Sequence, residues 1–247
     1  MASRSKSKPP EALRGRLALI TGANRGIGRA IAQALARQGC DVIITGRDRK
    51  ALERAGRELE KLGIEVVTQV CDVRHPHSVD YLFALVRGLR RPLDFLINNA
   101  GIGHSNLNVS DLPYPTWCSV IDTNLNGMFL VTQAALVVMK PGSTIVNNLS
   151  VTAERVFTGS AAYNASKHGA LGFTDTLREE LRPSGIRVIA LMPGPTDTAI
   201  WETLWPKAPR RKMMSAETVA QTVVYALLLP ADSTVEKITV MPTGGAL

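Results

Sequence analysis

The sequence predicts an α/β protein: a single doubly wound domain whose parallel sheet has about seven strands, with helices on both faces. Three observations carry this prediction. Strand-like and helix-like segments alternate along almost the whole chain, the connections between them are short, and the strand-like segments are continuous apolar runs. Strands that are buried on both faces have such runs, and a repeated β–α order implies right-handed parallel crossovers.

The expected elements follow one another without a domain boundary. We expect strands at 17–21, 41–45, 65–70, 93–97, 143–149, 186–192 and 237–241. We expect helices at 26–38, 49–62, 76–89, 114–139, 163–182 and 216–229. Gly63 suits the end of the second helix and Pro76 the first turn of the third. We therefore expect one domain at 15–247, a disordered basic tail at 1–14, and a small substrate lid at about 195–214.

Composition places the chain among ordinary globular proteins. Of its 247 residues, 45% are hydrophobic and 20% are charged. No apolar run approaches the roughly 18 residues of a membrane span, and no secretory signal begins the chain, so we expect no membrane partner. Three widely spaced cysteines suit a reducing, cytoplasmic location. We expect no metal, because the histidines lack ligand spacing. They are His75, His77, His104 and His168.

The net charge of +8 raises nucleic acid as a partner, but the charge is unevenly placed. Half of the excess, +4, lies on residues 1–16, where five Lys and Arg residues accompany only Glu11. A basic tail alone is weak evidence for nucleic-acid binding, so we expect no nucleic-acid partner. Binding through that tail stays an alternative.

A glycine-rich turn, TGANRGIG at 21–28, joins the first strand to the first helix. Gly22 permits a tight turn, Gly26 lets the backbone approach a pyrophosphate, and Gly28 allows close packing of helix on strand. The N–H groups at the start of the helix can then bind phosphates. This strand–turn–helix context predicts a dinucleotide site.

The end of the second strand favours NADP(H) over NAD(H). Folds selective for NAD usually place an acidic residue there, but this chain has Gly46 followed by Arg47. Arg25, in the glycine turn, can reach the same region, and two guanidiniums suit a 2′-phosphate. Asp48 is expected to cap the next helix. The alternative is that both arginines are simply exposed charges.

Further motifs follow in a fixed order. They are Asp72 after the third strand, NNAG at 98–101, Asn124 in NLNG, Ser150, Tyr163-x-x-x-Lys167 and Pro193-Gly194. Together with TGxxxGIG they resemble the short-chain dehydrogenase/reductase family, from about Arg16 to Leu247. The likeness is to NADPH-dependent 3-oxoacyl-acyl-carrier-protein reductases and related carbonyl reductases. It implies a Rossmann-type domain and an oxidoreductase.

The expected catalytic group consists of Ser150, Tyr163, Lys167 and Asn124. Tyr163 and Lys167 are four residues apart at the start of a helix, so their side chains face the same way. A phenol is a poor base at neutral pH unless a nearby cation stabilises its phenolate, and Lys167 supplies that charge. Ser150 would polarise a carbonyl. The resemblance implies that Lys167 also holds the nicotinamide ribose and that Asn124 anchors a relay water.

The motifs and the resemblance together assign the cofactor contacts. These residues are Gly22, Asn24, Arg25, Gly26, Ile27, Gly28, Arg47, Asp72, Val73, Asn99, Ala100, Gly101, Tyr163, Lys167, Pro193, Gly194, Thr196 and Thr198. Asn98 is expected mainly to hold the sheet together. Two departures from the common family pattern, NNLS at 147–150 and MPTGGAL at the end, remove no catalytic group.

The resemblance places the small-molecule substrate beside an apolar set of residues. They are Ile102, Phe157, Ile200, Trp201, Leu204 and Trp205. This set favours an apolar ketone or aldehyde, with Tyr163 as general acid and base. An NAD-linked alcohol dehydrogenase and a non-catalytic NADPH-binding protein remain alternatives.

Two expectations concern the lid and the assembly. Prolines interrupt the segment at 199–214, and four basic residues (Lys207, Arg210, Arg211 and Lys212) repel one another there, which favours a mobile lid. The same charges would draw in an acidic substrate or an acyl-carrier partner. The helices at 114–139 and 163–182 are apolar on more than one face, which favours a homo-oligomer, either a dimer or a tetramer.

Overall fold

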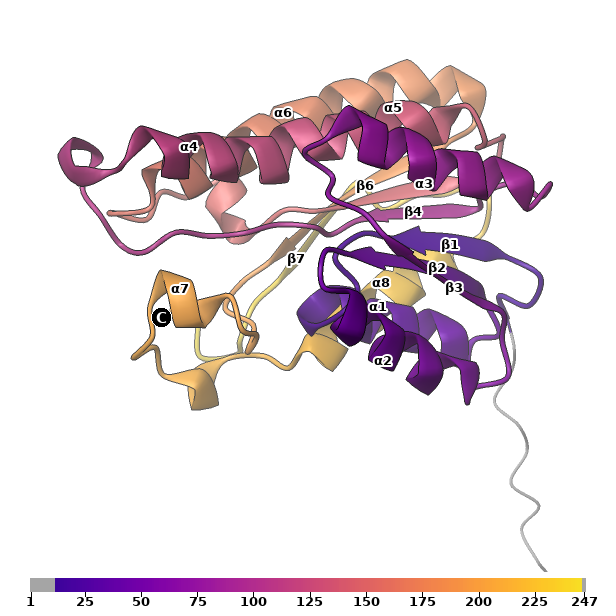
Figure 1. Ribbon diagram of the computed structural model, residues 1–247, viewed down its shortest axis with the longest axis horizontal. Coiled ribbons are helices and arrows are strands. Elements are labelled where there is room, and N and C mark those ends of the chain that lie inside the picture. Colours follow the sequence, from indigo (N-terminus) through magenta and orange to yellow (C-terminus); the bar gives the residue numbers. More distant parts are fainter. Residues whose placement is uncertain (1–11, 246–247) are drawn as a thin grey trace, which may run out of the picture.

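The computed structural model describes residues 12–245 (Figure 1). Most of the expected basic tail therefore lies outside the described residues. The described chain begins with a turn in which Leu13 is buried and its N–H donates to the carbonyl of Gln38 at 2.9 Å. Among residues 12–245, no helix is both long enough and apolar enough to cross a membrane.

The expected doubly wound α/β fold is confirmed. Within residues 12–245, seven strands form one parallel sheet in the order β3-β2-β1-β4-β5-β6-β7. The strands are β1 (Leu17–Ile20), β2 (Asp41–Gly46), β3 (Val66–Val70), β4 (Phe95–Asn98), β5 (Thr144–Asn148), β6 (Arg187–Pro193) and β7 (Lys237–Val240). The strand order reverses at β1, where Ile20 pairs with Ile44 of β2 and Ile97 of β4. Ligands bind at such a switch point.

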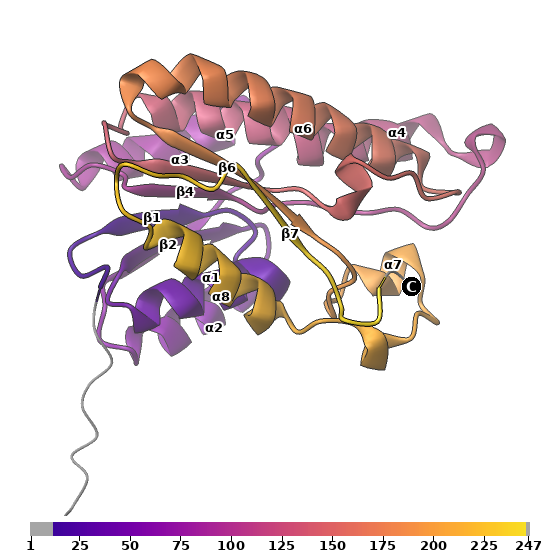
Figure 2. The ribbon, with the colours of Figure 1, turned by 180° about the vertical axis from the view of Figure 1, so that it is seen from behind.

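Helices cover both faces of this sheet (Figures 1 and 2). The α-helices are α1 (Gly26–Arg37), α2 (Arg49–Glu60), α3 (Pro76–Gly88), α4 (Tyr114–Ile121), α5 (Gly127–Leu136), α6 (Ala161–Leu181), α7 (Trp201–Leu204) and α8 (Ala216–Leu227). Short 3₁₀ turns lie at Val109–Asp111, Val151–Ala153, Arg182–Ser184 and Arg210–Lys212. Helices α1, α2 and α8 pack on one apolar face, and α3, α5 and α6 on the other. Both faces of the five inner strands are therefore buried, as the apolar runs predict, whereas the edge strands β3 and β7 are partly exposed.

The helix expected at 114–139 is not one regular α-helix. It consists of α4, a π-helical turn at Asp122–Asn126, and α5, which ends at Leu136. The π turn widens the helix where the side chain of Asn124 bonds to other segments, a use for which such turns are known. Other boundaries shift by at most two residues; α6 begins at Ala161, so Tyr163 lies in its first turn. Asp48 caps α2, as expected, by accepting from the N–H of Ala51 at 3.0 Å.

A buried chain of polar side chains ties the two central strands to the helices above them. Asn98 donates to the hydroxyl of Thr132 at 2.8 Å and to Oδ1 of Asn147 at 2.9 Å. Asn147 in turn donates to the hydroxyl of Thr174 at 2.9 Å. The chain runs from α5 through β4 and β5 to α6, and it gives Asn98 the sheet-holding role expected of it. It fixes the spacing of the elements that carry the site described below.

We expect Asn147→Ala to lower the free energy of unfolding by about 2–4 kcal/mol, because it removes one hydrogen bond from each of the buried side chains of Asn98 and Thr174 and leaves a cavity between them. Denaturant unfolding measures the loss. Asn108→Ala serves as the control, since Asn108 is exposed and its side chain caps nothing. Equal stabilities of the Asn147→Ala and Asn108→Ala proteins would show that these buried hydrogen bonds do not stabilise the fold.

Candidate active site

A cavity of about 1260 Å³ opens along the carboxyl ends of the strands. All the residues assigned to cofactor contacts line it except Gly28, and of the expected catalytic group Ser150, Tyr163 and Lys167 line it. Gly28 and Asn124 lie behind the cavity wall, in the packing that supports it. The structure thus brings together, at the switch point, nearly every residue that the motifs single out.

The glycine turn has the shape of a phosphate cradle. Gly22 and Gly26 have φ angles of +65° and +59°, in the left-handed region that only glycine adopts without strain. A Cβ atom at Gly28 would clash with Nδ2 of Asn99 and lie 2.7 Å from the carbonyl oxygen of Gly22. Helix α1 begins here without a side-chain cap. Its first N–H groups and its positive end therefore face the cavity, an arrangement that suits an anion.

Asn99 holds this turn against the neighbouring strand. Its Nδ2 donates to the carbonyl oxygens of Thr21 and Gly22 at 2.9 and 3.1 Å, and its backbone N–H donates to the hydroxyl of Thr21 at 2.9 Å. Oδ1 of Asn99 accepts from Nδ2 of Asn148 at 2.8 Å. The carbonyl oxygen of Asn148 accepts from Nζ of Lys167 at 3.1 Å. One bonded path therefore connects the glycine turn to the expected catalytic lysine.

Tyr163 and Lys167 lie together on α6, as their spacing predicts. Nζ of Lys167 is 5.6 Å from the centroid of the Tyr163 ring, and Lys167 is only 4% exposed. Burial raises the pKa of Tyr163 to about 12, although a hydrogen bond with the Ser150 side chain opposes the shift. Burial lowers the pKa of Lys167 to about 8. At neutral pH the phenol is therefore protonated and the lysine is mostly charged.

Asn124 is fully buried, and its amide group is engaged within the protein. Oδ1 accepts from the N–H of Ile102 at 2.8 Å, and Nδ2 donates to the carbonyl of Ile102 at 2.9 Å and to the hydroxyl of Ser166 at 3.0 Å. Both amide hydrogens are used in these bonds. The side chain therefore fixes the segment after Gly101 and the helix that carries Tyr163, and it has no hydrogen left to donate to a water.

The far end of the cavity is rich in arginine. Arg25 and Arg47 are exposed and line it, as expected, and Arg29 and Arg54 line it as well. The side chain of Asn24 lies over Gly46, where a Cβ atom would be 2.8 Å from Oδ1 of Asn24. Neither Arg29 nor Arg54 was expected from the sequence. The spacing gives a signal for Arg54, because it follows the capping residue Asp48 and Ala51 at intervals of three residues, and these three positions lie on one side of the helix.

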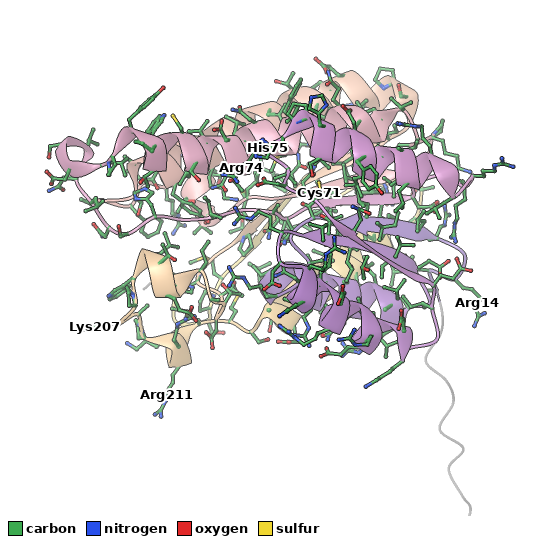
Figure 3. All side chains as sticks on the ribbon, viewed as in Figure 1. Arg14, Cys71, Arg74, His75, Lys207 and Arg211 are labelled. Atoms are coloured by element: carbon green, nitrogen blue, oxygen red, sulfur yellow. The ribbon has the colours of Figure 1, made fainter. Side chains whose placement is uncertain are left out.

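Asp72, next to the arginines, carries an ion pair of its own. Arg74 donates from Nε at 2.9 Å to Oδ1 and from Nη2 at 2.6 Å to Oδ2 of Asp72, which holds the pKa of this carboxyl below its usual value. Arg74 and His75, labelled in Figure 3, mark the start of α3, and Nε2 of His75 is 3.8 Å from Oδ2 of Asp72. The Asp72 carboxyl, which is expected to contact the cofactor, is thus ionised and held in one orientation.

Apolar side chains form the other end of the cavity, as expected for the substrate. They are Ile102, Phe157, Ile200, Trp201, Leu204 and Trp205. The last four belong to the expected lid, in which α7 lies. Leu204 presses on Gly103, where a Cβ atom would lie 2.8 Å from Cγ of Leu204. The tip of the lid is therefore seated against the loop that follows β4.

The base of the lid is fastened. The N–H of Asp197 donates to the carbonyl of Met214 at 2.8 Å, and the N–H of Met214 donates to the carbonyl of Pro195 at 3.0 Å. The sequence predicts that Arg210 and its basic neighbours repel one another. In the structure Arg210 instead forms an ion pair with Asp197 at 2.7 Å. Lys207 and Arg211 project away from the body of the protein (Figure 3). Among residues 12–245, no group of three His, Cys, Asp or Glu side chains could hold a metal ion.

Comparison with known proteins agrees with the geometry. A family model described as short chain dehydrogenase matches residues 16–209. An uncharacterized oxidoreductase of Staphylococcus haemolyticus is 34% identical over 232 residues, 93% of this chain and 98% of that protein.

Two solved structures resemble this one closely. An alcohol dehydrogenase from the archaeon Thermococcus sibiricus, complexed with 5-hydroxy-NADP, has a TM-score of 0.86 and 29% identity, covering 92% of this chain and 97% of that one. A short chain dehydrogenase from Burkholderia cenocepacia, in complex with NADP, has a TM-score of 0.85 and 30% identity, covering 93% and 97%. The chain therefore belongs to the short chain dehydrogenase family and is an oxidoreductase.

Proposed function

We propose that the enzyme transfers a hydride between NADP(H) and an apolar ketone or aldehyde, or the corresponding alcohol, with Tyr163 as general acid and base. The observation that carries this proposal is the placement of Tyr163, Lys167 and Ser150 between an arginine-rich end and an apolar end of one cavity. Consumption of NADPH, followed by its absorbance with a panel of carbonyl compounds, tests it. No consumption with any carbonyl would favour a non-catalytic NADPH-binding protein.

The residues present fit a nicotinamide dinucleotide phosphate. Gly22 and Gly26 keep the cradle clear of side chains, and the first turn of α1 offers N–H donors to the pyrophosphate. Arg25 and Arg47 would bind the 2′-phosphate, and Asp72 would accept from the adenine amine. When bound, such a cofactor supplies the hydride. The solved relatives with NADP and 5-hydroxy-NADP support this assignment.

The protein's own part in the reaction is to orient the carbonyl and to supply a proton. Ser150 would donate a hydrogen bond to the carbonyl oxygen and so stabilise the negative charge that develops there. Tyr163 would give its phenolic proton to that oxygen, because an alkoxide is a much stronger base than a phenolate. The charge of Lys167 would stabilise the phenolate that remains. In the direction of alcohol oxidation, the same phenolate would take the proton back.

We also propose a homo-oligomer in a reducing, cytoplasmic compartment. Tyr114, Phe129 and Val137, on and just beyond α4 and α5, are exposed apolar side chains that a partner would cover. Phe129 also meets Phe173 of α6 edge to face, with ring centroids 6.1 Å apart. The three cysteines are free thiols, which suits a reducing compartment.

Tyr163→Phe should lower turnover by at least about 100-fold, the scale of lost acid–base catalysis, and leave the dissociation constant for NADPH nearly unchanged. Steady-state kinetics and cofactor titration measure the two effects. Tyr81→Phe is the matched control, because Tyr81 is 67% exposed on α3. Near-normal turnover by the Tyr163→Phe enzyme would refute the proposed mechanism.

NADP(H) should bind more tightly than NAD(H), and Arg47→Asp should erase or reverse the preference, a change of about 10- to 150-fold in the ratio of dissociation constants. Arg49→Asp makes the same charge change on a residue that does not line the cavity, and it should leave the ratio almost unchanged. Equal dissociation constants for the two cofactors in the wild type would instead favour an NAD-linked alcohol dehydrogenase.

Lys167 should make stability depend on pH. Its pKa in the folded protein, about 8, lies below the value of about 10.4 in an unfolded chain. Between these values the unfolded state binds a proton that the folded state has released, so the free energy of unfolding rises with pH. We expect this free energy to gain about 1–3 kcal/mol relative to Lys167→Met between roughly pH 8 and 10. Parallel pH curves for the two proteins would contradict burial of a charged lysine.

The segment at 199–214 should act as a lid that becomes more ordered when cofactor and substrate bind. Gly103→Ala should displace Leu204 from its contact with residue 103. It should therefore speed hydrogen exchange across the lid and raise the KM for apolar ketones. Gly88→Ala is the control, since an added Cβ atom there meets nothing within 4 Å. Equal protection of the lid from hydrogen exchange in the Gly103→Ala and Gly88→Ala proteins would show that the contact of Leu204 with Gly103 does not hold the lid.

A further inference from the structure

A second asparagine, Asn164, holds a wall of the substrate cavity much as Asn124 holds Ile102. Asn164 follows Tyr163 in the sequence and is 8% exposed. Its Nδ2 donates to the carbonyl oxygen of Phe157 at 2.8 Å, and its Oδ1 accepts from the N–H of Phe157 at 3.5 Å. Phe157 lines the cavity. The peptide groups on both sides of the Phe157 Cα atom are thus fixed by one side chain.

The loop that carries Phe157 is exposed and yet firmly held. Val156 is 77% exposed and Phe157 is 36% exposed. Two residues further on, Gly159 has a φ angle of +76° and leaves space that Oδ1 of Asn106 fills, while its carbonyl accepts from the N–H of Leu107 at 3.0 Å. Exposed apolar side chains on such a loop add little to folding. A rigid apolar surface at a cavity is therefore better explained by ligand binding.

We propose that Asn164 is a positioning residue for substrate selection. By fixing the backbone of Phe157, it holds the phenyl ring as a rigid wall of the cavity to which the lid contributes Trp201 and Trp205. Aromatic walls favour flat ring systems, which stack or meet them edge to face. The site therefore selects carbonyl compounds that carry an aromatic ring over compact aliphatic ones. This inference rests on the proposed carbonyl chemistry and names the substrate class.

The position of Asn164 beside Tyr163 offers a competing explanation, in which Asn164 acts on the tyrosine. Adjacent residues of a helix point in directions about 100° apart, and the side-chain bonds of Asn164 run to Phe157. The two roles predict different kinetics. A role through Phe157 changes the KM of ring-bearing substrates, whereas a role through Tyr163 changes the turnover of every substrate.

The test compares an aryl ketone, acetophenone, with a compact one, butanone, in NADPH-dependent reduction. Asn164→Asp keeps the size of the side chain but cannot donate to the carbonyl of Phe157. It should raise the KM for acetophenone about 10-fold, and change kcat/KM for butanone by less than about 3-fold. Phe157→Ala should raise the acetophenone KM similarly, and the double variant should be no worse than Phe157→Ala. Asn108→Asp adds the same charge to a nearby exposed asparagine and should have neither effect.

Several results would overturn the inference. They are equal losses on both ketones, a fall in turnover alone, additive losses in the double variant, or a wild type without preference for acetophenone. Hydrogen exchange gives a readout that needs no catalysis, because residues 154–160 should exchange faster in the Asn164→Asp protein. Unchanged exchange there would refute the claim that Asn164 holds the backbone of Phe157. If the wild type reduces no carbonyl compound with NADPH, the proposed function fails, and the exchange measurement still decides the role of Asn164.

Discussion

The site depends most on the hydrogen bonds of the Asn99 side chain. Parallel strands meet at their carboxyl ends, but nothing in a sheet by itself fixes the loops that leave those ends. Asn99 fixes two of them, because it bonds to the carbonyls of Thr21 and Gly22 and is bonded in turn by Asn148. Gly28 has no side chain so that this contact can form. The shape of the phosphate cradle and the position of β5 are therefore set together.

The same constraint places the proposed chemistry. The carbonyl of Asn148 receives the Lys167 ammonium, and Lys167 lies beside the ring of Tyr163. Asn124 secures the opposite side through Ile102. Strand ends and α6 thus carry the groups that are proposed to react, and the segment at 199–214 contributes apolar side chains to the cavity wall.

Local pattern explains which features could be predicted from the sequence. The apolar runs and glycine turn predict the fold and cradle, and the spacing of Tyr163 and Lys167 predicts their common face, because each is a property of neighbouring residues. The bonds of Asn124 in the π turn and those of Asn148 join segments far apart in the chain, whereas Asn164 bonds back to Phe157 in the loop just before its own helix. Asparagine occurs in many settings, so its partner cannot be read from sequence. The ion pair of Arg210 escaped prediction for the same reason, since the return of the lid onto Asp197 is a tertiary contact.

The central claim is that this cavity moves a hydride from NADPH to a carbonyl carbon while Tyr163 protonates the oxygen. Transfer of deuterium tests it most directly: NADPH labelled at its transferable position is incubated with the enzyme and a ketone, and the alcohol is analysed by mass spectrometry. The account predicts an alcohol with deuterium on the carbinol carbon, formed in equal amount with NADP⁺. A protein that binds labelled NADPH but yields no deuterated alcohol from any ketone or aldehyde would contradict it.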